Sequence, residues 1–143
     1  MPDFITLVND VLEEQGKTTK DLFKNGVISE NTFYKYRHRY PNLKTLLRIA
    51  NYLQVSIDYL FELSDENKFK PYLIEQKNLY NNIISLIENS KISQRKFSKD
   101  LNYSRVNLLR WKKGMLPNIQ TLIEISKYFN VPVDDLLEKE HKK

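Results

Sequence analysis

The stretch SQRKFSKDLNYSRVNLLRWKKG, residues 93–114, contains two short helical patterns joined by a turn at Asn102–Tyr103. Apolar residues recur at helical spacing, which predicts one buried face on each helix: Phe97, Leu101, Tyr103, Leu108 and Trp111. Ser98 is small where the two helices would approach each other closely. The other face of the second helix is then left free, and it is mostly basic: Arg105, Val106, Leu109, Arg110 and Lys113.

Positive charge is concentrated around this stretch and around one earlier segment. The chain has 143 residues and a formal net charge of +5. Residues 91–113 contain eight Lys or Arg against one Asp, and residues 17–39 contain six against two acids. A surface that needs only to be soluble does not require such local concentration. The two segments are therefore candidate binding faces.

The chain contains an internal repeat. Shifting the sequence by 76 residues aligns 41–62 with 117–138, and ten of these 22 positions are identical. Upstream the shift becomes 75, which pairs 29–39 with 104–114. Self-similarity of this length predicts a tandem duplication of one structural unit.

Each repeat is predicted to contain five helices, because residues that cap helix N-termini stand before the apolar patterns. In the first repeat we expect helices over about 4–15, from Thr18 or Thr19, after Ser29, after Asn42 and near Ser56. In the second we expect them from about Pro71, from Ser93, from Ser104 to Gly114, from Asn118 and with Pro132 at the first position. The polar segment 64–70 is expected to be a linker or the start of the next helix.

Two helices of this kind, one bracing the other, make a helix-turn-helix. The sequence resembles the lambda-repressor-like (XRE) helix-turn-helix family over nearly all of 75–138, and more weakly over 4–62. The resemblance is carried by the following residues: Gln94, Phe97, Ser98, Ser104, Leu108, Trp111, Gly114, Pro117–Asn118 and the Val-x-x-Asp-x-Leu ending at 131–136. It implies an all-α fold with two tandem five-helix lambda-repressor-like domains, 1–66 and 70–143. It also implies that the chain binds double-stranded DNA, usually as a dimer, and regulates transcription.

The resemblance also implies roles for individual residues. Arg105, Val106 and Arg110 fall where the family reads base edges, and the first repeat offers Asn31 and Lys35 for this role. Arginine can bond guanine O6 and N7 in pairs, and valine can meet a thymine methyl group. Residues expected to contact the DNA backbone or to support the base readers are Gln94, Ser104, Asn107, Lys112, Lys113, Thr19, Ser29, Arg37 and Arg39.

The first repeat departs from the family pattern. Thr19 replaces the glutamine, Val27 takes the turn position usually held by Gly or Asn, and Glu30 stands where Arg105 does. No glycine follows its third helix. The first repeat could therefore contact DNA, or it could serve dimerisation or partner binding. Its tyrosines (Tyr34, Tyr36 and Tyr40) are equally compatible with packing and with stacking on bases.

Other function classes find little support in the sequence. There is no cysteine, no run of 18 apolar residues, and no pattern of a signal peptide at the start. No metal-binding, P-loop or dinucleotide motif is present. We therefore expect a cytoplasmic, non-enzymatic regulator of repressor type, without cofactor or metal. Its partners would be double-stranded DNA, a second copy of the chain, and a regulatory protein. The alternative is an antitoxin-like or inhibitor-like adaptor on the same scaffold, or a binder of the RNA backbone.

Overall fold

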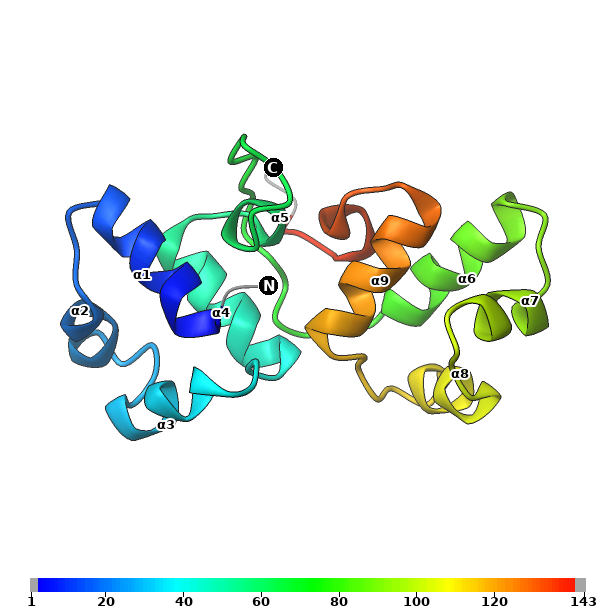
Figure 1. Cartoon of the computed structure of the whole chain (residues 1–143), viewed down its shortest axis with the longest axis horizontal. Coiled ribbons are helices and arrows are strands. Elements are labelled where there is room, and N and C mark those ends of the chain that lie inside the picture. The colour runs from blue at the N-terminus through cyan, green and yellow to red at the C-terminus, as the bar shows by residue number, and fades with distance from the viewer. Residues whose placement is uncertain (1–2, 141–143) are drawn as a thin grey trace. The chain divides into compact units, whose positions relative to one another are not determined.

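The computed structural model describes residues 3–140, and in it the chain divides into two compact units (Figure 1). The first unit runs to Ile74 and includes Glu140, and the second comprises Glu75–Lys139. Every regular element of residues 3–140 is a helix, which confirms the all-α prediction. In the same residues no helix is long and apolar enough to cross a membrane.

The first unit contains five α-helices and one short 3-10 helix. In chain order they are α1 (Phe4–Glu14), α2 (Thr19–Lys24), α3 (Glu30–Tyr34), η1 (Lys35–Arg37), α4 (Leu43–Leu53) and α5 (Ile57–Leu60). Side-chain oxygens of Ser29, Asn42 and Ser56 accept N–H groups in the first turn of α3, α4 and α5, at 3.2, 2.9 and 3.0 Å. The helix starts predicted from these caps are confirmed, because each cap satisfies a donor that the helix itself leaves free.

The second unit repeats this order with four α-helices and a terminal 3-10 helix. They are α6 (Leu79–Asn89), α7 (Gln94–Asp100), α8 (Arg105–Lys112), α9 (Ile119–Phe129) and η2 (Val133–Leu136). Ser93, Ser104 and Asn118 cap α7, α8 and α9, as the sequence predicts.

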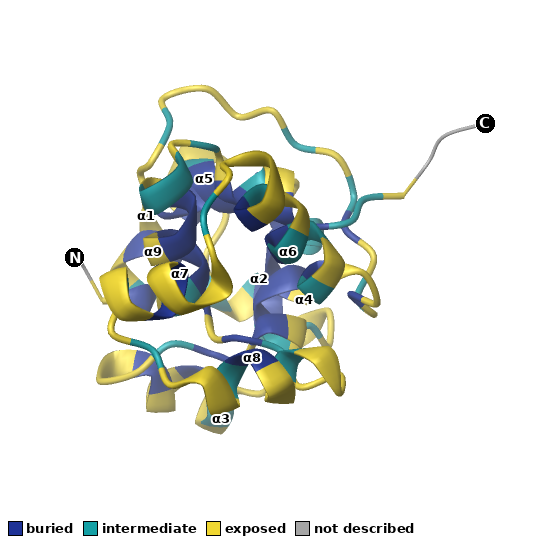
Figure 2. Ribbon diagram, turned by 90° about the vertical axis from the view of Figure 1, so that its right-hand side faces the viewer, coloured by how far each residue is buried: buried dark blue, intermediate teal, exposed yellow. Residues whose placement is uncertain are grey.

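Each unit has its own apolar core, seen as the buried inner sides of the helices in Figure 2. The predicted stripe of α4 is buried throughout: Leu43, Leu46, Leu47, Ile49, Ala50 and Leu53. In α9 the buried apolar residues are Ile119, Leu122, Ile123 and Ile125. In the second unit Phe97 of α7 packs on Tyr128 and Phe129 of α9, with ring centroids 5.8 and 5.7 Å apart, and α8 packs against α6.

The first helix of the second repeat begins later than predicted. It starts at Leu79, not at Pro71. The buried amide of Gln76 exchanges two hydrogen bonds with the backbone of Glu138, at 3.0 and 2.7 Å, and the Glu138 carboxylate accepts the Asn78 N–H. These bonds tie the segment before Leu79 to the end of the second unit and keep it out of the helix.

Two further helix boundaries differ from the prediction. Pro132 has extended backbone and precedes η2, so it is not the first residue of an α-helix. The helix after Ser29 is α-helical for only five residues and continues as η1. Tyr36 explains the early end, because its buried ring packs edge-on against Phe4 with centroids 5.8 Å apart, and its backbone is not helical.

The turn in the first repeat also differs from the prediction. Gly26 holds the left-handed position (φ +70°), and Val27 follows it with its N–H bonded to the Leu22 carbonyl at 3.0 Å. The second repeat places Asn102 (φ +58°) in this position. Left-handed backbone favours Gly and Asn. The first repeat therefore keeps the usual turn chemistry, and the prediction of Val27 at this position is wrong.

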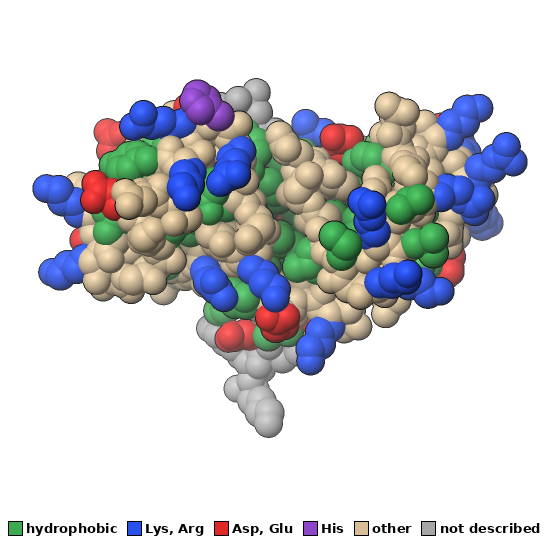
Figure 3. Space-filling model, turned by 90° about the horizontal axis from the view of Figure 1, so that it is seen from below, with side chains coloured by type: hydrophobic (Ala, Val, Ile, Leu, Met, Phe, Trp, Pro, Cys, Tyr) green, Lys and Arg blue, Asp and Glu red, His purple; other side chains and the backbone are tan. Residues whose placement is uncertain are grey.

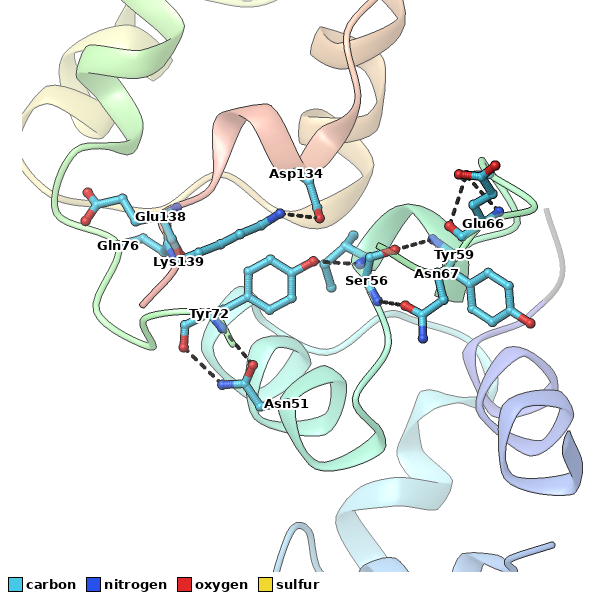
Figure 4. Close-up of polar contacts among 12 residues, drawn as sticks. Asn51, Ser56, Tyr59, Glu66, Asn67, Tyr72, Gln76, Asp134, Glu138 and Lys139 are labelled. Atoms are coloured by element: carbon cyan, nitrogen blue, oxygen red, sulfur yellow. Dashed lines mark hydrogen bonds and ion pairs between the residues drawn. The ribbon is translucent and has the colours of Figure 1, made fainter. Parts of the chain in front are cut away.

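Residues 67–72, which we call the strap, pack on the first unit. Asn67 accepts the Ser56 N–H at 2.9 Å and donates to the Gln54 carbonyl at 2.9 Å. The side chain of Asn51 makes two bonds to the backbone of Tyr72, at 3.0 and 2.8 Å (Figure 4). The buried Tyr72 hydroxyl accepts the Ile57 N–H at 2.8 Å. Most of the segment between the repeats is thus part of the first unit.

Candidate nucleic-acid interface

Helices α7 and α8 are joined by a short turn that fixes where α8 begins. Asn102 takes the left-handed conformation, and the Tyr103 N–H bonds the Ser98 carbonyl at 2.8 Å. The Ser104 hydroxyl then accepts the Val106 N–H at 3.2 Å. A left-handed residue followed by a serine cap ends one helix and starts the next within four residues.

The inner side of α8 is held by an aromatic cluster. Phe97 and Leu108 are buried, whereas Leu101, Tyr103 and Trp111, which were expected to be buried, are only half-buried. The Tyr103 ring packs edge-on against Phe97 and Trp111, with centroids 6.3 and 6.1 Å apart. This cluster orients α8 from the side opposite its free face.

Two tyrosine hydroxyls connect the helix-turn-helix formed by α7 and α8 to α9. Tyr103 donates to Glu124 at 2.8 Å, and Tyr128 donates to Asp100 at 2.6 Å. Burial, followed by the bond to Glu124, raises the pKa of the Tyr103 hydroxyl. Sequence reasoning missed Glu124, because it stands 21 residues from Tyr103 and nothing in its local pattern marks it as a partner. The first bond attaches the turn to α9, and the second attaches the end of α7 to the same helix.

Asp100 supplies a testable pH dependence. The Tyr128 hydroxyl and then Lys96, whose ammonium lies 3.2 Å from the carboxylate, lower the pKa of Asp100. A carboxyl group with a lowered pKa in the folded state stabilises the fold above its unfolded pKa, and this stabilisation is lost as pH falls through the folded pKa. We expect the Asp100 carboxyl signal in NMR to titrate at higher pH in Tyr128→Phe than in the parent chain. An unchanged midpoint would contradict the assigned cause.

The outer side of α8 is exposed and basic. Arg105, Val106, Leu109 and Arg110 are all exposed there, with Lys112 and Lys113 at the end of the helix. Within residues 3–140 neither Arg105 nor Arg110 forms an ion pair. Gln94 is exposed at the start of α7, and Asn107 is half-buried. Figure 3 shows blue cationic side chains surrounding green hydrophobic ones on this face of the second unit, on its right-hand side.

The corresponding face of the first unit has a different composition. Glu30, Asn31 and Tyr34 are exposed on α3, with Lys35, Arg37 and Arg39 after it. The Arg37 guanidinium lies over the Tyr34 ring, 5.4 Å from its centroid. Thr19 is half-buried, and Ser29 is occupied as the cap of α3.

The tyrosines of the first unit fall into two groups. Tyr36 is buried against Phe4, and the half-buried Tyr40 packs on Phe4 and Phe61, so both have packing roles. Tyr34 is exposed. Of the three, only Tyr34 presents a ring on the face that corresponds to the outer side of α8.

Comparison with protein-family models gives two matches that lie in different halves of the chain. Residues 83–136 match a model described as helix-turn-helix, and residues 8–66 match one described as a Cro/C1-type helix-turn-helix DNA-binding domain. The chain carries two XRE-like helix-turn-helix domains. Neither the curated proteins nor the solved structures gave a match to it.

The two matches agree with the geometry of both helix-turn-helix domains. The match over 8–66 contains α2 and α3, and the match over 83–136 contains α7 and α8, each with its capped turn. The Cro/C1-type match indicates a DNA-binding regulator, and helix-turn-helix families of this kind are typically non-enzymatic.

Proposed function

We propose that the chain is a sequence-specific, double-stranded DNA-binding transcriptional regulator of bacterial or phage repressor type. The observation that carries the proposal is the outer face of α8. It presents two arginines that form no ion pair with any residue of 3–140, on a helix that is capped at its start and braced from its inner side. A helix held in this way fits the major groove of B-DNA.

Within the second helix-turn-helix domain, the proposed roles follow the chemistry of each side chain. Arg105 and Arg110 bond guanine edges, and Val106 meets an apolar group of a neighbouring base. Lys112 and Lys113, at the end of α8, lie where cations would contact phosphates, together with Gln94 and the half-buried Asn107. Ser104 supports these contacts indirectly by capping α8.

The first helix-turn-helix domain is proposed to bind DNA as well, with weaker base reading. Asn31 and Lys35 are its base readers, and Arg37 and Arg39 contact the backbone. Thr19 and Ser29 support α2 and α3 as residues at their starts. The Glu30 carboxylate repels phosphates, and the favourable contact open to it on a base edge is to accept from a cytosine amino group. We therefore expect this domain to tolerate fewer base pairs at the position that Glu30 faces.

Selection of bound sites from random duplex DNA by the full chain tests the proposal. We expect an enriched sequence motif, with two half-sites if both domains read bases. Sedimentation of the complex on the selected duplex then reports whether a homodimer binds. Equal affinity for the selected duplex and for its single strands would overturn the proposal and favour a protein-binding or RNA-backbone role.

Salt dependence separates phosphate contacts from base contacts. Each phosphate neutralised contributes about −0.9 to the slope of log affinity against log salt. Replacing Lys112 and Lys113 together by alanine should therefore make the slope shallower by about 2 and weaken binding similarly on all sequences. A slope that stays unchanged in this variant would remove both lysines from the interface.

A further inference from the structure

The helix-turn-helix of the first unit ends with a different backbone geometry from that of the second. After Tyr34, α3 passes into the 3-10 helix η1, whereas α8 stays α-helical to Lys112. A 3-10 helix has three residues per turn, so side chains three positions apart lie one above the other. Tyr34 and Arg37 have this spacing, and the Arg37 guanidinium lies 5.4 Å from the centroid of the Tyr34 ring. The 3-10 turn thus stacks an arginine on a tyrosine.

Aromatic packing holds this turn and the tyrosine ring in place. The buried ring of Tyr36 packs edge-on against Phe4, which anchors the middle of η1 in the core of the first unit. The Tyr34 ring itself packs against Phe23 and Phe33, with centroids 6.1 and 5.5 Å apart, and is 37% exposed. The ring is therefore a supported surface on which a cation can rest.

The second unit has other residues at these two positions. The repeat alignment places Leu109 opposite Tyr34 and Lys112 opposite Arg37. Leucine offers no aromatic face to a cation, and the lysine ammonium lacks the planar fork of a guanidinium. Within residues 3–140, an arginine stacked on a tyrosine is therefore found in the first unit only.

Stacking leaves the edge of the Arg37 guanidinium open. The ring covers one face of the guanidinium plane, and the N–H groups point outward within that plane. Arg37 is exposed, and it forms no ion pair with any part of the chain that the structure describes. Lys35 and Arg39 are exposed beside it, and residues 35–39 contain no acid. A guanidinium fork in such a cationic segment fits a phosphate, whose oxygens accept two parallel bonds.

We propose that Tyr34 is a positioning residue, whose ring holds the Arg37 guanidinium in place to bond two oxygens of one DNA phosphate. A long side chain loses rotamer freedom when a ligand fixes it, and stacking removes part of this freedom before binding. The contact of Arg37 with the DNA backbone belongs to the proposed function, on which this proposal rests. What Tyr34 adds is affinity without sequence preference.

A double-mutant cycle on the selected duplex tests the coupling between the two residues. Tyr34→Leu removes the aromatic face, and it should weaken binding of the full chain about two- to tenfold, as expected for one side chain that must be ordered on binding. In Arg37→Ala the same change should have no further effect. Tyr34→Phe keeps the ring and should bind as the parent chain does.

A second cycle is the matched control. Lys35 is an exposed cation next to Tyr34, and adjacent residues of a helix do not face each other. The effects of Tyr34→Leu and Lys35→Ala should therefore add. Leucine keeps an apolar side chain on Phe23 and Phe33, so we expect a melting temperature close to that of the parent chain. Tyr34→Met, which also lacks the ring, repeats the cycle if leucine lowers the melting temperature.

Methylphosphonate linkages identify the phosphate, because each replaces one charged oxygen by a methyl group. The full chain is titrated on selected duplexes that carry one such linkage at successive positions. We expect one linkage at which the parent chain loses about tenfold in affinity, as for hydrogen bonds to a charged group, and Arg37→Ala loses nothing. Tyr34→Leu should lose less than the parent chain at this linkage and as much at every other.

The outcomes separate this proposal from the proposed function. Selective duplex binding in which Tyr34→Leu and Arg37→Ala have additive effects would overturn the positioning role and leave the DNA-binding proposal intact. The same holds if Arg37→Ala is as sensitive as the parent chain to every methylphosphonate. Failure of the parent chain to bind any duplex would overturn both proposals.

Discussion

Replacing Tyr72 by alanine is expected to lower the free energy of unfolding of the first unit by about 3–5 kcal/mol, as for other large buried aromatic side chains. Tyr72 lies outside the residues matched by the Cro/C1-type model, yet its side chain is only 1% exposed. The substitution removes the ring and also the hydroxyl that accepts the Ile57 N–H at the start of α5. Two costs, a cavity and an unsatisfied buried donor, therefore act at the same site.

Amide hydrogen exchange of the full chain measures this loss. We expect the amides of α4 and α5 to exchange with a lower free energy of opening in Tyr72→Ala than in the parent chain. Tyr72→Phe keeps the ring and removes only the hydroxyl, so it should cost about 1–3 kcal/mol. Lys70→Ala, an exposed change within the strap, should stay within about 0.5 kcal/mol. If Tyr72→Ala behaves like Lys70→Ala, the strap does not belong to the stable part of the first unit.

The strap shows why the sequence predicts some boundaries well and others poorly. Caps such as Ser29, Asn42 and Ser104 act on backbone groups two or three residues away, so the local pattern contains the whole interaction. The bonds from Asn51 to Tyr72 and from Gln76 to Glu138 join residues 21 and 62 positions apart. No local pattern contains such pairs, and the segment between the repeats was therefore expected to be a linker or a helix.

The turn of the first repeat shows a second limit, which comes from the repeat alignment itself. A constant shift of 75 places Val27 opposite Asn102. In the structure α2 is one residue shorter than α7 and the following turn one residue longer, so that Gly26 takes the left-handed position. Two compensating changes of one residue leave the overall shift unaltered, and the sequence comparison cannot detect them.

The candidate interface was largely predictable, because helical periodicity determines which side chains of α8 share a face. Arg105, Val106 and Arg110 are exposed together, as the spacing predicts. Leu109 is also exposed, as the same spacing predicts, whereas the half-burial of Trp111 depends on how closely the neighbouring helices approach, which periodicity does not contain. The roles of these residues on DNA stay predictions.

Replacing Arg105 and Arg110 together by alanine is expected to weaken binding to the selected duplex by about 2–6 kcal/mol, since each bidentate contact to guanine contributes about 1–3 kcal/mol. Binding to random duplexes should fall far less, because other cations remain near the motif, among them Lys99, Lys112 and Lys113. Fluorescence anisotropy on both duplexes at one salt concentration gives the two affinities. Lys127→Ala, in the last turn of α9, removes an exposed cation from another helix and is the matched control.

The ratio of the two affinities decides between base reading and general attraction. Both arginines are exposed and neither forms an ion pair in the described residues, so their removal should leave the fold intact and the sole tryptophan, Trp111, in its half-buried place. A loss confined to the selected duplex then assigns base recognition to the face of α8. A loss of equal size on every duplex means that the arginines act only as phosphate-binding cations, and sequence preference must then come from other residues or from the shape of the DNA.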